Sequence, residues 1–232
     1  MKTFKHNPLP IVIPPLEQVT TPLARYYLSA EGKRYYSVTT VTGFKKRDVI
    51  EEWRKRVGEA EADRISEIAA TRGTAVHNTI EKYLRNELSE QVTNFATIAK
   101  YYSELDKIDN IQMIETRMCS NIMGLAGTVD CIAEFDGVLS VIDFKTSKRR
   151  KEEFEIGHYF QQATAYTVMY KELTGKNIDQ VVIIIGSDDG KCVSFVRDPK
   201  CYVKRLAQAI DNFRSKQPEL ESEMEAKNGL GI

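Results

Sequence analysis

The sequence predicts a mixed α/β domain whose central sheet is flanked by helices, with a helical N-terminal portion ahead of it. Two observations predict this class. The spacing of apolar residues follows the helical period of about 3.6 between residues 48 and 105, and it changes to the strand period of two between residues 113 and 145. Further along, a helical stretch precedes two more strand-like runs. Strands and helices that alternate in this way are typical of α/β folds.

The size and composition of the chain fit one ordinary domain with extensions, or two small domains. It has 232 residues, of which 42% are hydrophobic, and this is enough to fill a core and to exclude wholesale disorder. Lysine and arginine together number 33, as do aspartate and glutamate, so the formal net charge is zero. Any attraction to nucleic acid must therefore come from local patches. The longest apolar run, at 181–186, is far shorter than the roughly 18 residues of a membrane span, so no membrane association is expected.

The N-terminal part is predicted to be mostly helical. Residues 1–30 are dotted with prolines and are expected to be irregular, and residues 34–41 are rich enough in β-branched and aromatic residues to form a strand. Apolar stripes then predict helices at 48–57, 59–84 and 92–105. Gly73 interrupts the second of these stripes, which leaves open whether it forms one helix or two.

The rest of the chain is predicted to form the sheet and the helices that cover it. Strands are predicted at 113–120, 128–135, 138–145, 180–185 and 192–196, and helices at 153–173 and from 198 to about 213. Gly175 supplies a C-terminal stop for the first helix, and Asp198-Pro199 supplies a start for the second. From Gln217 onward the acidic tail is expected to be frayed.

A tight hairpin is predicted at Asp136-Gly137, because this dipeptide between two β-rich runs favours a two-residue type I′ turn. Counting outward from the turn places Asp130 directly opposite Asp143, with their Cβ atoms about 4.5–5.5 Å apart. Lys145 lies two residues beyond Asp143 and therefore on the same face of the sheet. The hairpin thus gathers two carboxylates and an ammonium group.

Two facing carboxylates destabilise a sheet unless something compensates for their charge. One of the pair is also expected to have a raised pKa. A divalent cation removes both costs, and hard oxygen ligands suit Mg²⁺ or Mn²⁺. The alternative is a solvated pair of strand aspartates, or one aspartate paired with Lys145, since Asp-x-Lys is a common sequence. Apolar neighbours on both faces, such as Val129 and Ile142, favour the metal, because burying unpaired carboxylates is costly.

Polar residues on two apolar helix stripes and on one strand complete the set of candidates. His77 shares a helix face with Gly73, and Gln162 and Tyr166 lie one turn apart on the 153–173 helix. Each of these could instead be a core residue with local polar partners. Glu115, near the start of a strand, could be a simple surface acid.

Several short motifs, each weak alone, occur in a meaningful order. They are Gly73-x-x-x-His77, Gly127-x-x-Asp130, Asp143-x-Lys145-Thr-Ser and Gln162-x-x-x-Tyr166. Together they resemble the RecB-like branch of the PD-(D/E)XK nuclease superfamily over roughly residues 68–187. Ser37-Val-Thr-Thr-Val followed by Trp53 is similar to the mitochondrial genome maintenance exonucleases and their phage and bacterial relatives.

This resemblance implies a restriction-endonuclease-like core and a role for each matching residue. Asp130 and Asp143 would ligate the metal together with the carbonyl of Phe144, and His77 would complete or support the coordination sphere. Lys145 would position the attacking water or stabilise charge on the scissile phosphate. Physically, a metal lowers the pKa of water and polarises the phosphoryl oxygen, while a fixed cation stands where negative charge builds. Two helix residues, Gln162 and Tyr166, would orient Lys145 or the phosphate, and Glu115 is a further candidate acid.

Nucleic acid is expected to contact local basic patches and nearby aromatic residues. Basic runs occur at 45–47, 54–56 and 148–151, the last of them just after the strand that carries Lys145. Each could instead be a solvated face, because Lys and Arg are mostly exposed. Aromatic residues near the first two runs suit stacking on single-stranded bases, or could be buried anchors for the N-terminal helix. The nucleic-acid-binding candidates are Ser37, Lys45, Lys46, Arg47, Trp53, Arg72, Lys148, Arg149 and Arg150.

The cysteines do not indicate a metal site. No two of Cys119, Cys131, Cys192 and Cys201 are spaced as Cys-x-x-Cys, which also disfavours relatives that hold an iron–sulfur cluster. Thiols in a reducing cytosol are the simpler interpretation. The first 15 residues lack the apolar core of a secretory signal. These features favour the cytosol of a bacterium or of a phage-infected host over a mitochondrion.

The leading hypothesis is a deoxyribonuclease that depends on Mg²⁺ or Mn²⁺. It would be an exonuclease of bacterial or phage origin that acts on single-stranded or end-bearing DNA in replication, repair or recombination. Three alternatives remain: a structure-selective endonuclease of the same fold, a catalytically silent nucleic-acid-binding module, and an unrelated α/β protein. Residues 1–60 are expected to form an extension and a helical DNA-contacting portion, 61–214 the nuclease core, and 215–232 a flexible acidic tail.

Overall fold

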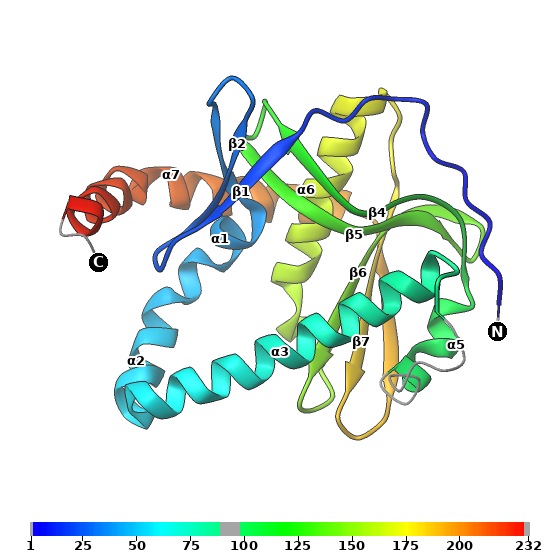
Figure 1. The fold of residues 1–232 in the computed structure, drawn as a ribbon, viewed down its shortest axis with the longest axis horizontal. Coiled ribbons are helices and arrows are strands. Elements are labelled where there is room, and N and C mark those ends of the chain that lie inside the picture. Colours follow the sequence, from blue (N-terminus) through cyan, green and yellow to red (C-terminus); the bar gives the residue numbers. More distant parts are fainter. Residues whose placement is uncertain (1, 89–97, 230–232) are drawn as a thin grey trace.

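The computed structural model describes residues 2–88 and 98–229, and a mixed β-sheet forms its centre (Figure 1). The sheet has eight strands in the order β1-β2-β3-β5-β6-β7-β8, and β4 pairs with β5 outside this path. The strands are β1 (Leu16–Thr20), β2 (Arg25–Ser29), β3 (Arg34–Ser37), β4 (Ile108–Ser120), β5 (Leu125–Phe135), β6 (Val138–Ser147), β7 (Gln180–Ser187) and β8 (Cys192–Arg197). The predicted mixed α/β class is confirmed.

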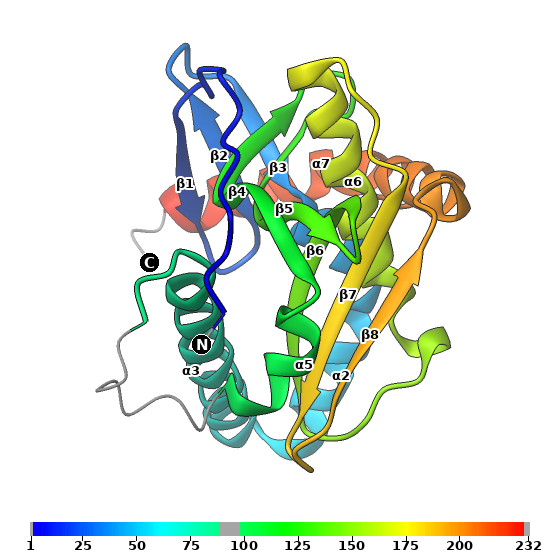
Figure 2. The same cartoon turned by 90° about the vertical axis from the view of Figure 1, so that its right-hand side faces the viewer.

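Helices cover both faces of this sheet. They are α1 (Val38–Gly43), α2 (Arg47–Val57), α3 (Glu59–Leu84), α5 (Tyr102–Leu105), α6 (Gly157–Thr174) and α7 (Lys200–Gly229). Alternate residues of β7 point to opposite faces: Val181 and Ile183 belong to the core under α6 and α7, and Val182 and Ile184 to the core under α3 and α5. Figure 2 shows α3 and α6 on opposite sides of the sheet. None of the described helices is long and apolar enough to span a bilayer.

The predicted hairpin between β5 and β6 is confirmed. Asp136 and Gly137 both have positive φ, 50° and 78°, as a type I′ turn requires. The ladder runs from Phe135 opposite Val138 to Cys131 opposite Ile142, which is the predicted register. Asp130 and Asp143 are the next residues outward on the two arms, so neither arm has slipped.

The predicted irregularity of residues 1–30 is confirmed for residues 2–15, which form no helix or strand apart from an isolated bridge at His6, and is wrong from Leu16 onward. β1 and β2 form an antiparallel hairpin, and β3 joins it to the main sheet by pairing in parallel with β5 through Tyr36–Leu125 and Ser37–Ala126. The strand predicted at 34–41 ends early, because Ser37 caps a helix. Its Oγ accepts the backbone N–H of Thr40 at 3.0 Å, and α1 begins at Val38.

The sheet forks along one edge of β5. Residues 125–126 pair with β3 on this edge, and residues 131–135 pair with β6. Between them, Gly127–Val129 have ladder partners only in β4, and Asp130 has no ladder partner among the described residues. The motif Gly127-x-x-Asp130 therefore lies where two neighbouring strands diverge.

Three helix predictions need correction or completion. α3 continues through Gly73 as one helix. α7 extends to Gly229 instead of ending near 213, and Leu220 and Met224 are buried where a frayed tail was expected. The helix predicted at 92–105 falls partly outside the described residues, and its described end consists of a short 3₁₀ turn, Ala99–Tyr101, followed by α5.

Candidate active site

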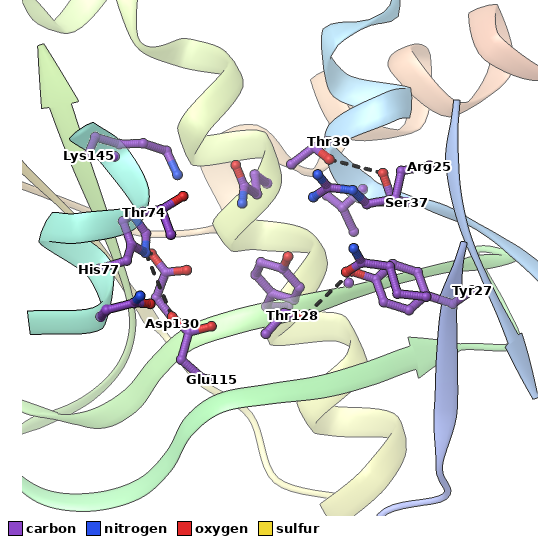
Figure 3. Close-up of a pocket in the computed structure, with 17 residues that line it drawn as sticks. Arg25, Tyr27, Ser37, Thr39, Thr74, His77, Glu115, Thr128, Asp130 and Lys145 are labelled. Carbon is purple, nitrogen blue, oxygen red and sulfur yellow. Dashed lines mark hydrogen bonds and ion pairs between the residues drawn. The ribbon is translucent and has the colours of Figure 1, made fainter. Parts of the chain in front are cut away.

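A cavity of about 420 Å³ occupies the fork in the sheet (Figure 3). Its lining comes from the hairpin of β1 and β2, the end of β3, α1, α3, β4, β5, β6 and α6. The candidates predicted from the sequence that line it are Ser37, Gly73, His77, Glu115, Gly127, Asp130, Lys145, Gln162 and Tyr166. Residues far apart in the chain thus meet in one hollow.

Asp130 and Asp143 hold different partners at the mouth of the hairpin. The Oδ2 atom of Asp130 accepts the backbone N–H of Phe144 at 2.8 Å, so this carboxylate ties β5 to β6 just beyond the last ladder pair. The Oδ1 atom of Asp143 accepts from Lys145 Nζ at 2.7 Å. Its Oδ2 atom is buried and has no hydrogen-bond partner among the described residues. This oxygen is therefore left without the partner that a buried carboxylate needs, and Asp143 itself does not line the cavity.

The burial of Asp143 is electrostatically unfavourable. Its side chain is only 2% exposed. Burial, opposed by the charge of Lys145 and assisted by that of Asp130, raises the pKa of Asp143 to about 6. Burial alone would lower the pKa of Lys145, but Asp143 and Asp130 outweigh it and raise that pKa. Asp143 and Lys145 thus depend on each other to remain charged, and Asp130 adds a negative charge beside this pair.

His77 reaches the acids from α3, and its two ring nitrogens have different partners. Nε2 lies 2.8 Å from the carbonyl oxygen of Phe144, and since a carbonyl can only accept, this nitrogen carries a proton. Nδ1 faces the carboxylates, 3.6 Å from Asp130 Oδ2 and 3.7 Å from Glu115 Oε1. Burial disfavours the charged ring, yet the two acids raise the pKa of His77 to about 9. A ring nitrogen oriented in this way is suited to bind a cation once its proton leaves.

Glu115 belongs to the acidic group because of an unusual backbone conformation. Its φ is 45°, in the left-handed region that non-glycine residues rarely adopt. It lies between Ile114, which pairs with Cys131, and Thr116, which pairs with Val129, so the register sets it against Asp130. Strained backbone of this kind concentrates at functional sites. From the sequence, Glu115 is only a minor candidate. In the structure it lies with His77 and Asp130 in the group that could hold a metal.

These residues fit a divalent cation. His77, Glu115 and Asp130 each offer one ligand atom, and these atoms all lie within 4.8 Å of one another. Asp143, also predicted as a ligand, lies outside this group, and its unpartnered Oδ2 is on the neighbouring strand. Carboxylate oxygens with one imidazole nitrogen form a donor set that binds divalent metals. The carbonyl of Phe144, predicted as a ligand, is hydrogen-bonded to His77.

Gln162 and Tyr166 extend from α6 to the cavity, as the helical spacing predicted. They are 7% and 2% exposed. Burial, followed by the charges of Asp130 and Asp143, raises the pKa of Tyr166 well above its ordinary value, so its hydroxyl stays protonated. Gly127 makes room for this ring, since a Cβ atom at that position would meet the Tyr166 hydroxyl. The spacing of glycine and tyrosine in the two motifs is therefore a packing relationship.

The main chain and ammonium group of Lys145 are held from two sides. Its backbone carbonyl accepts from the Tyr101 hydroxyl at 3.0 Å. Its Nζ lies 5.1 Å from the centre of the Tyr159 ring, within the range of a cation–π contact. These contacts, with the bond to Asp143, leave Lys145 little freedom of position.

Most of the predicted nucleic-acid-binding residues lie outside this cavity. Ser37 lines it, but its hydroxyl is engaged by Thr39 and Thr40. Arg72 is ion-paired with Asp188 at 2.5 Å and lines a neighbouring cavity of about 450 Å³. Lys46 lies 3.1 Å from His158. The others lie on the 3₁₀ turn Phe44–Lys46, on α2 and in the loop after β6: Lys45, Arg47, Trp53, Lys148, Arg149 (paired with Glu155) and Arg150.

Sequence reasoning missed several residues that line the cavity. On α3, Thr74 lies one turn before His77, and helical spacing would have found it; Asn78 follows His77 directly and lies one turn after Thr74. Thr128 lies between the two residues of a motif already singled out. Arg25 and Tyr27 gave no signal, because the segment that carries them was expected to be irregular.

Comparison with known proteins agrees with this geometry. A family model described as the PD-(D/E)XK nuclease superfamily matches residues 47–228. Among curated proteins, none matches the chain. A similar solved structure is that of an exonuclease candidate from Eubacterium rectale, which is 10% identical, with 68% of each chain covered and a TM-score of 0.44. The family match includes α3, the acidic strands and α6, which together form most of the cavity.

Proposed function

Because the chain belongs to the PD-(D/E)XK nuclease superfamily, we propose that it is a metal-dependent deoxyribonuclease that hydrolyses phosphodiester bonds. The observation that carries this proposal is the unpartnered, buried Oδ2 atom of Asp143 beside Lys145, next to the cluster of His77, Glu115 and Asp130. A buried acidic group of this kind needs a cation, and Lys145 adds a fixed positive charge alongside it.

The proposed roles follow from the contacts of each residue. His77, Asp130 and Asp143 hold the ion, with Glu115 or the Phe144 carbonyl as further oxygen donors. When bound, the ion lowers the pKa of a water molecule and polarises a phosphoryl oxygen. Lys145 stabilises the charge that develops on the phosphate, and the neutral donors Gln162 and Tyr166 orient it from α6.

We propose Mg²⁺ or Mn²⁺ as the ion. Carboxylate oxygens predominate among the donors, which suits both metals, and the imidazole of His77 suits Mn²⁺ better than Mg²⁺. Turnover with both ions, and faster turnover with Mn²⁺, is the result expected from this donor set.

We further propose an exonuclease of the RecB-like branch, close to the mitochondrial genome maintenance exonucleases and their phage and bacterial relatives. The motifs on α3, β5, β6 and α6 support the branch, and the Ser37 motif supports the closer likeness. A cavity of about 420 Å³ suits a single strand better than an unopened duplex, which favours single-stranded or end-bearing DNA in replication, repair or recombination. The free cysteines suit a reducing cytosol, bacterial or phage-infected.

End-labelled oligonucleotides incubated with the purified chain and Mg²⁺ or Mn²⁺ test the proposal. Stepwise shortening that EDTA abolishes, and that Asp143→Asn removes, is expected. Asp179→Asn, at an exposed ion pair with Lys200, is the matched control and should digest normally. A circular single strand separates the alternatives: an exonuclease leaves it whole, whereas a structure-selective endonuclease opens it. Metal-independent cutting, or cutting that survives Asp143→Asn, would contradict this site.

A further inference from the structure

Arg25 is a cation without a counter-charge in the active-site cavity. It is the first residue of β2, and its side chain lines the cavity from the side opposite Lys145 and the acids (Figure 3). Among the described residues, no carboxylate or carbonyl binds its guanidinium. Other arginines nearby are engaged: Arg72 pairs with Asp188, and Arg117 donates to the Leu16 carbonyl. The Arg25 guanidinium is therefore available to a ligand.

The backbone of Arg25 is held in place by α1. Its N–H donates to Thr40 Oγ1 at 3.1 Å, and the same hydroxyl donates to the Arg25 carbonyl at 3.2 Å. Ser37 Oγ donates to Thr40 Oγ1 at 2.9 Å. The Ser37–Thr40 pair thus fixes the start of β2, and a flexible side chain projects from a rigid base.

The wall that carries Arg25 contains neutral donors and acceptors but no acid. Tyr27 donates to Gln18 Oε1 at 3.1 Å, and its hydroxyl lies 3.4 Å from Thr128 Oγ1. The opposite wall holds Glu115 and Asp130. The cavity is therefore acidic at one end, where a metal fits, and cationic at the other. A substrate strand with one phosphate at the acidic end would place a neighbouring phosphate toward Arg25.

We propose that Arg25 binds a phosphate of the substrate strand that neighbours the phosphate undergoing hydrolysis. The inference rests on the proposed nuclease function and assigns the N-terminal hairpin as a substrate-binding wall. A guanidinium presents planar paired donors that match phosphate oxygens, and such contacts are stronger than those between neutral groups. The hairpin lies outside residues 47–228, which the family model matches.

Equilibrium binding of a short fluorescent single-stranded DNA, measured by anisotropy in EDTA over a series of KCl concentrations, tests this inference. Arg25→Ala and Arg25→Gln should each raise Kd by about tenfold at moderate salt. They should also lower the slope of log Kd against log salt by about 0.7, the value for one lost phosphate contact on a single strand. Arg25→Lys should restore the slope but only part of the affinity, because it keeps the charge and loses the paired donors.

Lys204→Ala, which removes one exposed charge from α7, is the control and should leave Kd and slope unchanged. If Arg25→Ala and Arg25→Gln both bind with the wild-type slope, Arg25 contacts no phosphate and the inference is wrong. Wild-type cleavage in Mg²⁺ is measured in parallel. Cleavage without any effect of Arg25 on binding overturns the inference alone, whereas a wild-type chain that neither binds nor cleaves DNA overturns the proposed function with it.

Discussion

The hydroxyl of Tyr166 occupies the space that a side chain at Gly127 would need. A Cβ atom at position 127 would lie 2.5 Å from Tyr166 Oη and 3.0 Å from its Cε1. Gly127 begins the stretch of β5 that pairs with β4 but with neither β3 nor β6. Because Tyr166 comes from α6 on one face of the sheet, this contact sets the depth of the cavity between Asp130 and Gln162.

Gly127→Ala is therefore expected to displace Tyr166 and to lower both stability and activity. Overpacking of this kind costs about 1–3 kcal/mol of unfolding free energy, which urea denaturation measures. The double variant Gly127→Ala/Tyr166→Phe should recover part of the loss, because it removes the closest atom. Gly43→Ala, with no atom within 4 Å of the new methyl group, is the control and should be neutral or slightly stabilising.

Divalent metal is expected to stabilise the fold. With free metal at about 100 times its Kd, the unfolding free energy should rise by about 2.7 kcal/mol, seen as a higher Tm. Asp143→Asn should abolish this shift, since it removes a carboxylate from the acidic group. Asp179→Asn should preserve it. A full metal-dependent shift in Asp143→Asn would mean that the ion binds elsewhere.

Lys145→Met is expected to reduce kcat by roughly 10²-fold or more while KM changes little. The reason is that a fixed cation acts mainly on charge that develops in the transition state. Single-turnover measurements at saturating DNA separate the two effects. Lys148→Met, three residues away and exposed, should lose affinity at most. A variant at Lys145 with wild-type kcat would remove this residue from catalysis.

Acidification below neutrality should destabilise the chain partly through His158. Burial, and then the charges of Lys46, Lys145 and Lys151, lower the pKa of His158 to about 4 from its usual 6.5. Between these values the unfolded chain binds more protons, so the stability that the neutral ring provides is present above pH 6.5 and is lost as the pH falls to 4. The unfolding free energy should fall by about 1 kcal/mol less in His158→Gln than in wild type between pH 7 and 5, after allowance for solvent screening. Equal losses in both proteins would exclude this contribution.

The sequence was most informative where local chemistry determines geometry. The Asp136-Gly137 turn and the two-residue period of its arms fixed a register that the structure confirms. Helical spacing likewise placed Gln162 and Tyr166 on the face of α6 that lines the cavity. In both cases the relevant contacts lie within one turn or one hairpin.

Prediction failed where distant segments or unusual backbone determine the outcome. The importance of Glu115 depends on a left-handed φ in the middle of β4, which strand alternation does not anticipate. Arg25 reaches the cavity because β3 pairs with β5, a contact between segments far apart in the chain. The acidic composition of the end of α7 predicted a frayed tail. Leu220 and Met224 are instead buried, and they keep the helix packed beyond Pro218.

The parallel pairing of β3 with β5 has an evolutionary consequence. The ladder that joins the N-terminal strands to the main sheet consists of two residue pairs, Tyr36–Leu125 and Ser37–Ala126. An exchange of the first 37 residues for another hairpin would leave the acidic cluster and Lys145 intact while it altered what enters. Catalysis and target preference could then diversify separately, and related chains with near-identical chemistry could digest quite different polymers.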